Sequence, residues 1–186
     1  TTDHGNIHSW LDFYDAGTSI GVKPILGSEF YQARKTRFDK DPEERSGPSQ
    51  NEWEQRGPYH ITILAKNNIG YNNLIKISSR SFLEGYYVKP RIDHQLISEH
   101  SEGIIVLSGC LNSEVCQALL RDDYQFALAS AKKMQDIVGR ENYFIEVQDH
   151  GLGEQKKVFN QLVQIAETIG AKVVPSGDCH YVHKSD

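Results

Sequence analysis

Six side chains of kinds that bind metal ions are spread along this chain of 186 residues. They are His4, Glu29, His60, Cys110, Asp178 and His180. Imidazole and carboxylate groups together suit zinc, manganese or iron, and a thiolate shifts the preference toward zinc. A cluster of such ions can activate water, clamp a phosphate group and stabilise the attacking and leaving oxygens. The residue types therefore indicate a metal-dependent hydrolytic site, if the fold brings them together.

Several of these candidates stand directly after a stretch that predicts a β-strand. Cys110 follows the apolar run 104–107, and Asp178 follows the run 172–175. Because the carboxyl ends of parallel strands meet at one edge of a sheet or barrel, such side chains can converge there. His60 is the exception, since it lies near the start of its apolar run. Its strand must therefore be placed differently from the others.

Short apolar runs alternate with longer amphipathic stretches along the chain. The predicted strands are 23–25, 59–65, 104–107, 143–147 and 172–175. The predicted helices are 7–19, 71–83, 113–120, 124–138 and 153–169. This alternation predicts an α/β fold with mainly parallel strands. The polar stretch 34–57 interrupts it and is interpreted as a long surface loop, with Trp53 favouring the alternative of a partner contact.

The composition narrows the class of protein. The net charge is −5, which argues against an autonomous nucleic-acid-binding module, because phosphate contacts require basic residues. The three cysteines are an odd number without disulfide-scaffold spacing, so a reducing compartment, the cytoplasm, is expected. No apolar run approaches the roughly 20 residues of a membrane-spanning helix.

Each candidate also has an ordinary explanation when it is taken alone. A histidine before glycine is commonly a turn residue, and a free cysteine such as Cys110 is commonly a small buried hydrophobe. Cys110 is also open to interpretation as a nucleophile with a histidine base. Asp149 and His150 repeat the Asp-His-Gly triplet that begins at Asp3. They either orient a ligand or face the substrate, or they form the first turn of a helix.

A series of short motifs runs in order along the chain. They are TDHGN at residues 2–6, KPILGSEFY at 23–31, YHIT at 59–62, FLEGYYVKPRID at 82–93, SGC at 108–110, QDHG at 148–151 and DCHY at 178–181. Together they resemble the PHP (polymerase and histidinol phosphatase) domain of bacterial DNA polymerase III alpha subunits. The similarity covers nearly the whole chain and is weakest in the loop 34–57.

The resemblance implies a distorted (βα)7-type PHP barrel, incomplete at its N-terminus, with a polar loop at about 34–57. It implies nine ligand positions for up to three divalent ions, zinc or manganese, with magnesium as an alternative. His4, Glu29, His60, Cys110, Asp178 and His180 match six of these positions, and Asp3 is an additional candidate. The other three would precede Thr1, in a first strand with a His-x-His motif. Residues 1–186 are therefore expected to be a single PHP domain fragment.

The resemblance also implies a function within a larger enzyme. The parent would be a cytoplasmic bacterial DNA-directed DNA polymerase, a nucleotidyltransferase of DNA replication whose palm, fingers and thumb lie outside this chain. The domain itself would be a metal-dependent phosphoesterase, a hydrolase linked to 3′–5′ exonuclease proofreading. Its expected partners are the rest of the alpha chain, the DNA primer terminus and an exonuclease subunit, with no membrane. The alternatives are a non-catalytic structural or docking scaffold and a small-molecule phosphatase of the histidinol phosphatase kind.

Overall fold

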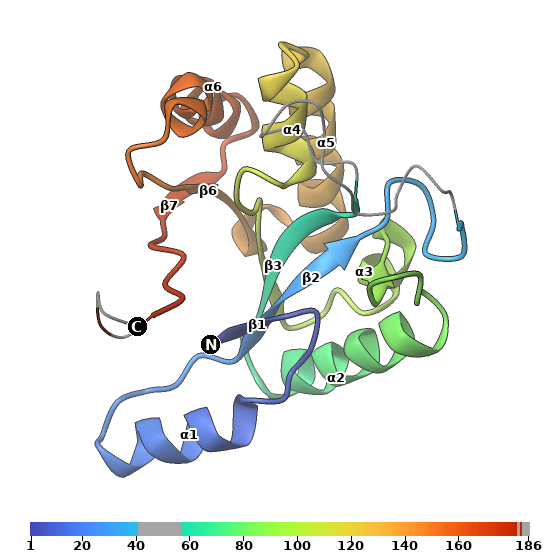
Figure 1. The fold of residues 1–186 in the computed structure, drawn as a ribbon, viewed down its shortest axis with the longest axis vertical. Helices are drawn as coiled ribbons and strands as arrows, with labels where there is room; N and C mark the ends of the chain where they lie inside the picture. Colours follow the sequence, from blue (N-terminus) through green and yellow to red (C-terminus); the bar gives the residue numbers. More distant parts are fainter. Residues whose placement is uncertain (41–56, 182, 184–186) are drawn as a thin grey trace.

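The computed structural model describes residues 1–40, 57–181 and 183. Strands and helices alternate through this part of the chain (Figure 1). The strands are β1 (Thr2–His4), β2 (Gly27–Gln32), β3 (Tyr59–Ala65), β4 (Arg91–Ile92), β5 (Ile104–Leu107), β6 (Tyr143–Val147) and β7 (Lys172–Pro175). The helices are α1 (Trp10–Ser19), α2 (Asn68–Leu83), α3 (His94–Glu99), α4 (Glu114–Leu120), α5 (Tyr124–Val138) and α6 (Gly153–Ile169), with a 3₁₀ turn η2 (Arg140–Asn142).

The strands form one mixed sheet in the order β1-β2-β3-β5-β6-β7, with β4 beside β2. The pairs β1–β2, β2–β4, β5–β6 and β6–β7 are parallel. Strand β3 alone runs antiparallel to both of its neighbours, β2 and β5. Among the described strands the sheet is not closed, since β1 and β7 stand at opposite ends of the order. The predicted α/β, barrel-like fold is confirmed in this open form.

The hydrophobic core lies between the sheet and the helices beside it. Ile63 on β3, Leu74 on α2 and Ile104 on β5 have no exposed surface. Helix α2 packs against β3 and β5, and α6 packs against β6 and β7. In Figure 1, α4, α5 and α6 gather beside the half of the sheet that contains β6 and β7. This packing holds the ends of the strands in fixed positions.

The predicted strands 59–65, 104–107, 143–147 and 172–175 are confirmed to the residue. The strand predicted at 23–25 is wrong, because the extended segment is β2, four residues later. Pro24 has no N–H to donate to a ladder. Gly27, by contrast, lies so close to β3 that a Cβ would sit 2.6 Å from the Ile63 carbonyl oxygen. The short elements β1, β4 and α3 were not predicted.

The loop predicted at 34–57 is only partly described, and 41–56, with Trp53, lies outside the described residues. At its beginning, the prediction of a surface loop is wrong for Arg37, which is 2% exposed. The Arg37 guanidinium donates to Asp93 at 2.9 Å and to Glu84 at 2.7 Å. Arg80 donates to the same Glu84 carboxylate at 2.7 Å. Charge pairing explains this burial, which a polar composition does not reveal.

We call the set Arg37, Arg80, Glu84, Asp93 and Glu99 the arginine cluster. Arg80 and Glu99 complete it with a further ion pair. Asp93 also accepts the backbone N–H of Leu96, so it caps α3. The cluster thereby ties the chain after β2 to the ends of α2 and α3.

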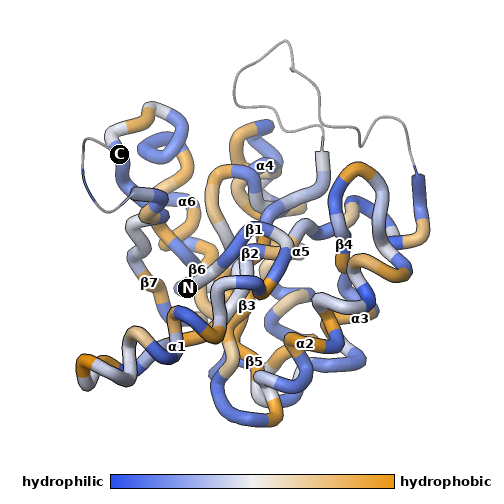
Figure 2. The backbone as a smooth tube through the Cα atoms, turned by 60° about the horizontal axis from the view of Figure 1, so that its bottom comes forward, coloured by the Kyte–Doolittle hydropathy of each residue, from blue (hydrophilic) through white to orange (hydrophobic). Residues whose placement is uncertain are grey.

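Helix α1 contributes little to the core. Trp10 is its one buried residue, and the indole N–H donates to the Gly27 carbonyl at 2.8 Å. Leu11 on the helix and Ile20 just after it are 73% and 76% exposed. Figure 2 shows α1 standing out from the rest of the described chain, with hydrophobic residues along it. Within the described part, none of the helices has the length and apolar character to cross a membrane.

Candidate metal centre

The reversed direction of β3 explains how His60 reaches the other candidates. His4, at the end of β1, pairs in register with Glu29 on β2. His60 lies at the start of β3 and pairs with Tyr31, two residues beyond Glu29. Because β3 is antiparallel, its beginning lies at the edge where the neighbouring strands end. The expectation that this strand is placed differently is therefore confirmed.

Glu29 is the central carboxylate of the site. Its Oε2 lies 2.9 Å from His4 Nδ1, and its Oε1 contacts His60 Nδ1. The Glu29 side chain is 12% exposed. Burial acts to raise the pKa of Glu29, but the hydrogen bond and charge of His60, with the charges of His4 and His180, outweigh it and lower that pKa. Glu29 therefore favours its ionised form, which is the form that binds a cation.

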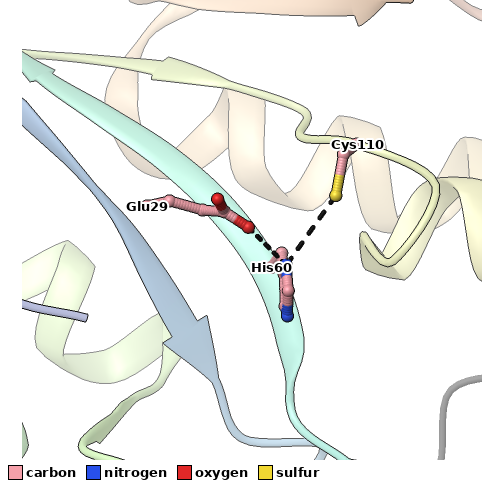
Figure 3. Close-up of side chains that lie close together, drawn as sticks. All are labelled: Glu29, His60 and Cys110. Atoms are coloured by element: carbon pink, nitrogen blue, oxygen red, sulfur yellow. Dashed lines mark hydrogen bonds and ion pairs between the residues drawn. The ribbon is translucent and has the colours of Figure 1, made fainter. Parts of the chain in front are cut away.

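Cys110 approaches the same point from the loop after β5. Its Sγ lies 3.8 Å from His60 Nδ1. Potential ligand atoms of Glu29, His60 and Cys110 all lie within 4.8 Å of one another (Figure 3). Gly109, with φ of 91°, permits this approach, because a Cβ there would meet the His60 carbonyl oxygen at 2.7 Å. Burial, with the charge of Glu29, raises the pKa of the Cys110 thiol, so thiolate formation needs a cation beside it.

His4 and His180 form a second pair across the open ends of the sheet. His4 Nδ1 faces Glu29 Oε2, and His180 Nδ1 lies 2.7 Å from the Asp178 carbonyl oxygen. An oxygen acceptor holds the imidazole hydrogen on the nearer nitrogen. In neutral rings, both Nε2 atoms then carry lone pairs, yet they face each other at 3.1 Å. The two nitrogens are therefore close enough to share one hydrogen or one metal ion.

The donor set fits a metal ion. Two nitrogens bound tetrahedrally to one zinc ion at about 2.0–2.1 Å are about 3.3 Å apart. The separation of 3.1 Å between the Nε2 atoms of His4 and His180 is close to that value. The mixture of imidazole, carboxylate and thiol groups suits zinc, and the carboxylates also suit manganese. The residues present therefore fit the expected divalent ions.

Five of the six candidates line a cavity of about 570 Å³ at the edge of the sheet, and the sixth, His60, contacts one of them, Glu29. Its lining includes His4, Glu29, Cys110, Asp178 and His180. Asp178 follows β7 with a φ of 43°, in the left-handed region. Its side chain is 38% exposed. The structure thus gathers the six residues at one edge, while their role as ligands stays a prediction.

The other three candidates, Asp3, Asp149 and His150, make different contacts from the six above. The Asp3 carboxylate is directed toward Ser9, whose N–H and hydroxyl donate to it at 2.8 and 2.7 Å. Asp149 accepts the Gly151 N–H at 3.0 Å, as a turn residue does. His150 Nε2 lies 3.0 Å from the Gly177 carbonyl oxygen, next to Asp178. The geometry supports an orienting contact for His150, a turn contact for Asp149 and, for Asp3, a contact with the residue before α1, although Asp3 also belongs to the cavity lining.

Sequence reasoning missed Glu146, a further acid in the cavity lining. It lies on β6 and is 5% exposed. Its Oε1 accepts hydrogen bonds from Ser176 and Gln148, but its Oε2 has no partner among the described residues. Burial raises the pKa of Glu146, and the negative charges of Asp178 and Glu29 raise it further. The hydrogen bonds from Ser176 and Gln148 act in the opposite direction. The sequence did contain a signal for Glu146, because it is the one charged residue in the otherwise apolar strand YFIEV.

Comparisons with known proteins agree with this architecture. A family model described as "PHP domain" matches residues 1–150. The chain is 43% identical over 185 residues to the DNA polymerase III subunit alpha of Thermus aquaticus, covering 100% of this chain and 14% of that protein. It is 45% identical to that of Deinococcus radiodurans and 42% identical to that of Treponema pallidum, each over 100% of this chain, and it spans 13% and 15% of their lengths. The chain belongs to the PHP domain family.

Proposed function

We propose that this domain binds divalent metal ions in its cavity and hydrolyses phosphoesters as part of a replicative DNA polymerase. The observation that carries the proposal is the His4–His180 pair, whose Nε2 atoms lie 3.1 Å apart, within reach of one metal ion. Glu29 supports it, because its two oxygens contact one histidine each. One carboxylate thereby connects both groups of donors.

His4, Glu29, His60, Cys110, Asp178 and His180 would hold zinc or manganese, with magnesium as an alternative. Bound ions would lower the pKa of water and stabilise charge on phosphate oxygens. The residues themselves orient the donors: Glu29 fixes His4 and His60, and the Asp178 carbonyl fixes the His180 ring. A cavity of about 570 Å³ has the size of common small-ligand sites, so it can admit the terminal nucleotide of a strand.

The names of the relatives suggest the substrate and the partners. Proteins called DNA polymerase III subunit alpha match this chain over its whole length, and the chain spans 13–15% of theirs. We therefore assign the primer 3′ end as substrate, in 3′–5′ exonuclease proofreading during DNA replication in the cytoplasm. The rest of the alpha chain, and an exonuclease subunit that docks on it, are the partners. Residues 1–186 act as one domain of that assembly.

The test uses the intact purified protein with a 3′-mismatched primer–template and Mn²⁺ or Zn²⁺. Removal of the mismatched nucleotide is expected in the wild type. It should be lost in a variant that combines Asp178→Asn with His180→Gln, and kept in Asp149→Ala, whose carboxylate makes a turn contact. Unchanged 3′ ends in the wild type, in the absence of any separate exonuclease, would refute a catalytic role.

One observation favours a second candidate function, a structural metal site. His4 and His180 belong to the β1 end and the β7 end of the open sheet, so an ion between them would join those ends. In that case the Asp178→Asn, His180→Gln variant should lose thermal stability and polymerase activity together, while no nuclease activity appears in any form of the protein. The scaffold function would then replace the hydrolytic one.

A further inference from the structure

The segment that carries Asp178 and His180 has little regular structure to hold it. Residues 176–181 follow β7 without helix or strand. Ser176 N donates to the Val147 carbonyl at 3.0 Å, which continues the β6–β7 ladder by one bond. Beyond it, Asp178 has a positive φ, and both candidate ligands are exposed. Side-chain contacts must therefore fix the position of this segment.

Three side chains at the end of β6 supply such contacts. Glu146 lies on β6, and Gln148 and His150 follow the end of that strand. Glu146 Oε1 accepts the hydroxyl of Ser176. Gln148 Nε2 lies 3.3 Å from both Glu146 Oε1 and Ser176 Oγ. His150 reaches the next residue, Gly177, through its carbonyl oxygen at 3.0 Å.

We propose that Glu146 is a positioning residue, which holds Ser176 and thereby fixes the ligand pair Asp178 and His180 at the cavity. This inference rests on the proposed metal-binding function. It assigns Glu146 no direct contact with a metal ion, because the hydrogen bonds of its carboxylate go to Ser176 and Gln148 and not to a candidate ligand. Gln148 and His150 support the same segment on either side of that contact.

The burial of Glu146 is itself an argument for such a role. A carboxyl oxygen without a hydrogen-bond partner in a buried place lowers stability. Glu29 and Asp178 are acids that line the same cavity, and their charges add to the unfavourable environment. An apolar residue in this strand would avoid both effects. An acid at this position can accept the Ser176 hydroxyl, which an apolar side chain cannot do.

The consequence concerns metal affinity. With Ser176 fixed, the Asp178 carbonyl can hold the His180 ring with Nε2 directed at His4. Residues that orient metal ligands typically contribute 10–100-fold to metal affinity. Loss of Glu146 should therefore weaken zinc binding by that factor, without removing any atom that binds the ion.

The test measures Zn²⁺ affinity of the intact protein by competition with a chelating indicator, and the melting temperature of the metal-free protein. Glu146→Ala should bind Zn²⁺ 10–100-fold more weakly. Glu146→Gln should stay within about 3-fold of the wild type, because its amide oxygen can still accept the Ser176 hydroxyl. Ser176→Ala, a smaller change, should reproduce the loss, and the double variant should add nothing to it. Glu167→Ala, at an exposed position of α6, is the matched control.

Two results would overturn the proposal. If Glu146→Gln binds as weakly as Glu146→Ala, the charge of Glu146 acts on the metal directly. If Glu146→Ala and Ser176→Ala both bind normally, the segment is held by other contacts. Direct variants separate this failure from a failure of the proposed function. If Asp178→Asn and His180→Gln also leave Zn²⁺ affinity unchanged, metal binding at this cavity is itself refuted.

Discussion

The arginine cluster and the metal cavity are both groups of ionisable residues, but they balance charge in opposite ways. In the arginine cluster, Arg37 and Arg80 supply the cations, and each lies within 3 Å of a carboxylate oxygen. In the cavity, Glu29 faces two imidazoles, and the His4 and His180 nitrogens face each other. In the first group, each of the three carboxylates has a guanidinium partner. The second has the pattern of a site that is completed by a cation from solution.

The comparison predicts that the arginine cluster contributes more to the stability of the metal-free protein. Arg37→Met should lower the free energy of unfolding by about 3–5 kcal/mol, because Asp93 is then left buried without its partner. Denaturant titration measures this loss. Lys132→Met, in the exposed pair with Asp136, is the control and should change stability by less than about 1 kcal/mol. A loss that small for Arg37→Met would contradict the distinction.

The cavity should respond to metal instead. Zn²⁺ at a hundred times its dissociation constant should stabilise the wild type by about 2.7 kcal/mol. His4→Ala should lose most of this gain, while its metal-free stability stays within about 0.5 kcal/mol of the wild type, since the His4 side chain is 49% exposed. Thermal melts with and without Zn²⁺ give both values. An equal response of His4→Ala and wild type to Zn²⁺ would show that the pair does not bind the ion.

Lowering the pH should weaken the ion pairs of the arginine cluster over a defined pH range. Hydrogen bonds from Arg80 and then Arg37 hold the pKa of Glu84 at about 2, below its ordinary value of 4.5. A carboxyl group with a lower pKa in the folded state adds stability above its ordinary pKa and loses it as pH falls toward the folded value. The free energy of unfolding should therefore fall between about pH 5 and pH 2, and less steeply in Glu84→Gln. Parallel slopes for the two proteins would contradict this assignment.

The smallest effect is expected at Asp149, beside both the cavity and the turn into α6. Its carboxylate accepts the Gly151 N–H and faces no candidate ligand in the described contacts. Asp149→Ala should lower stability by about 0.5–1 kcal/mol and leave Zn²⁺ affinity unchanged. Denaturation and indicator competition measure these two quantities. A large fall in affinity would place Asp149 among the residues that hold the ion.

The sequence predicts well those elements whose signals are local. Tyr124–Val138 and Gly153–Ile169 are helices as predicted, because each combines helical periodicity with a glycine just after its end. The sequence places this strand too early, at 23–25 instead of β2, because the residues of β2, GSEFYQ, alternate less clearly than the apolar run before them. Strands β1 and β4 are too short to leave a pattern, and they form through pairing with β2.

For the candidate site too, the sequence predicted the features that have local signals and missed those that depend on tertiary contacts. Residue types and motif order predicted which side chains gather at the cavity, and His60 could be identified as an exception. Tertiary contacts decided the rest: the burial of Arg37 depends on Asp93, and the contact of Glu146 depends on Ser176, 30 residues away. Such pairings leave no trace in periodicity or local spacing.

The contact between His4 and His180 joins residues that are 176 positions apart. During synthesis, a ribosome must therefore translate nearly all of these 186 residues before the two imidazoles can meet. An ion held between them would bind only after β7 has joined the sheet. Occupancy of this pair would thus report that β1 and the segment after β7 have come together, and a chain that stops before His180 would lack it however well its earlier elements had formed.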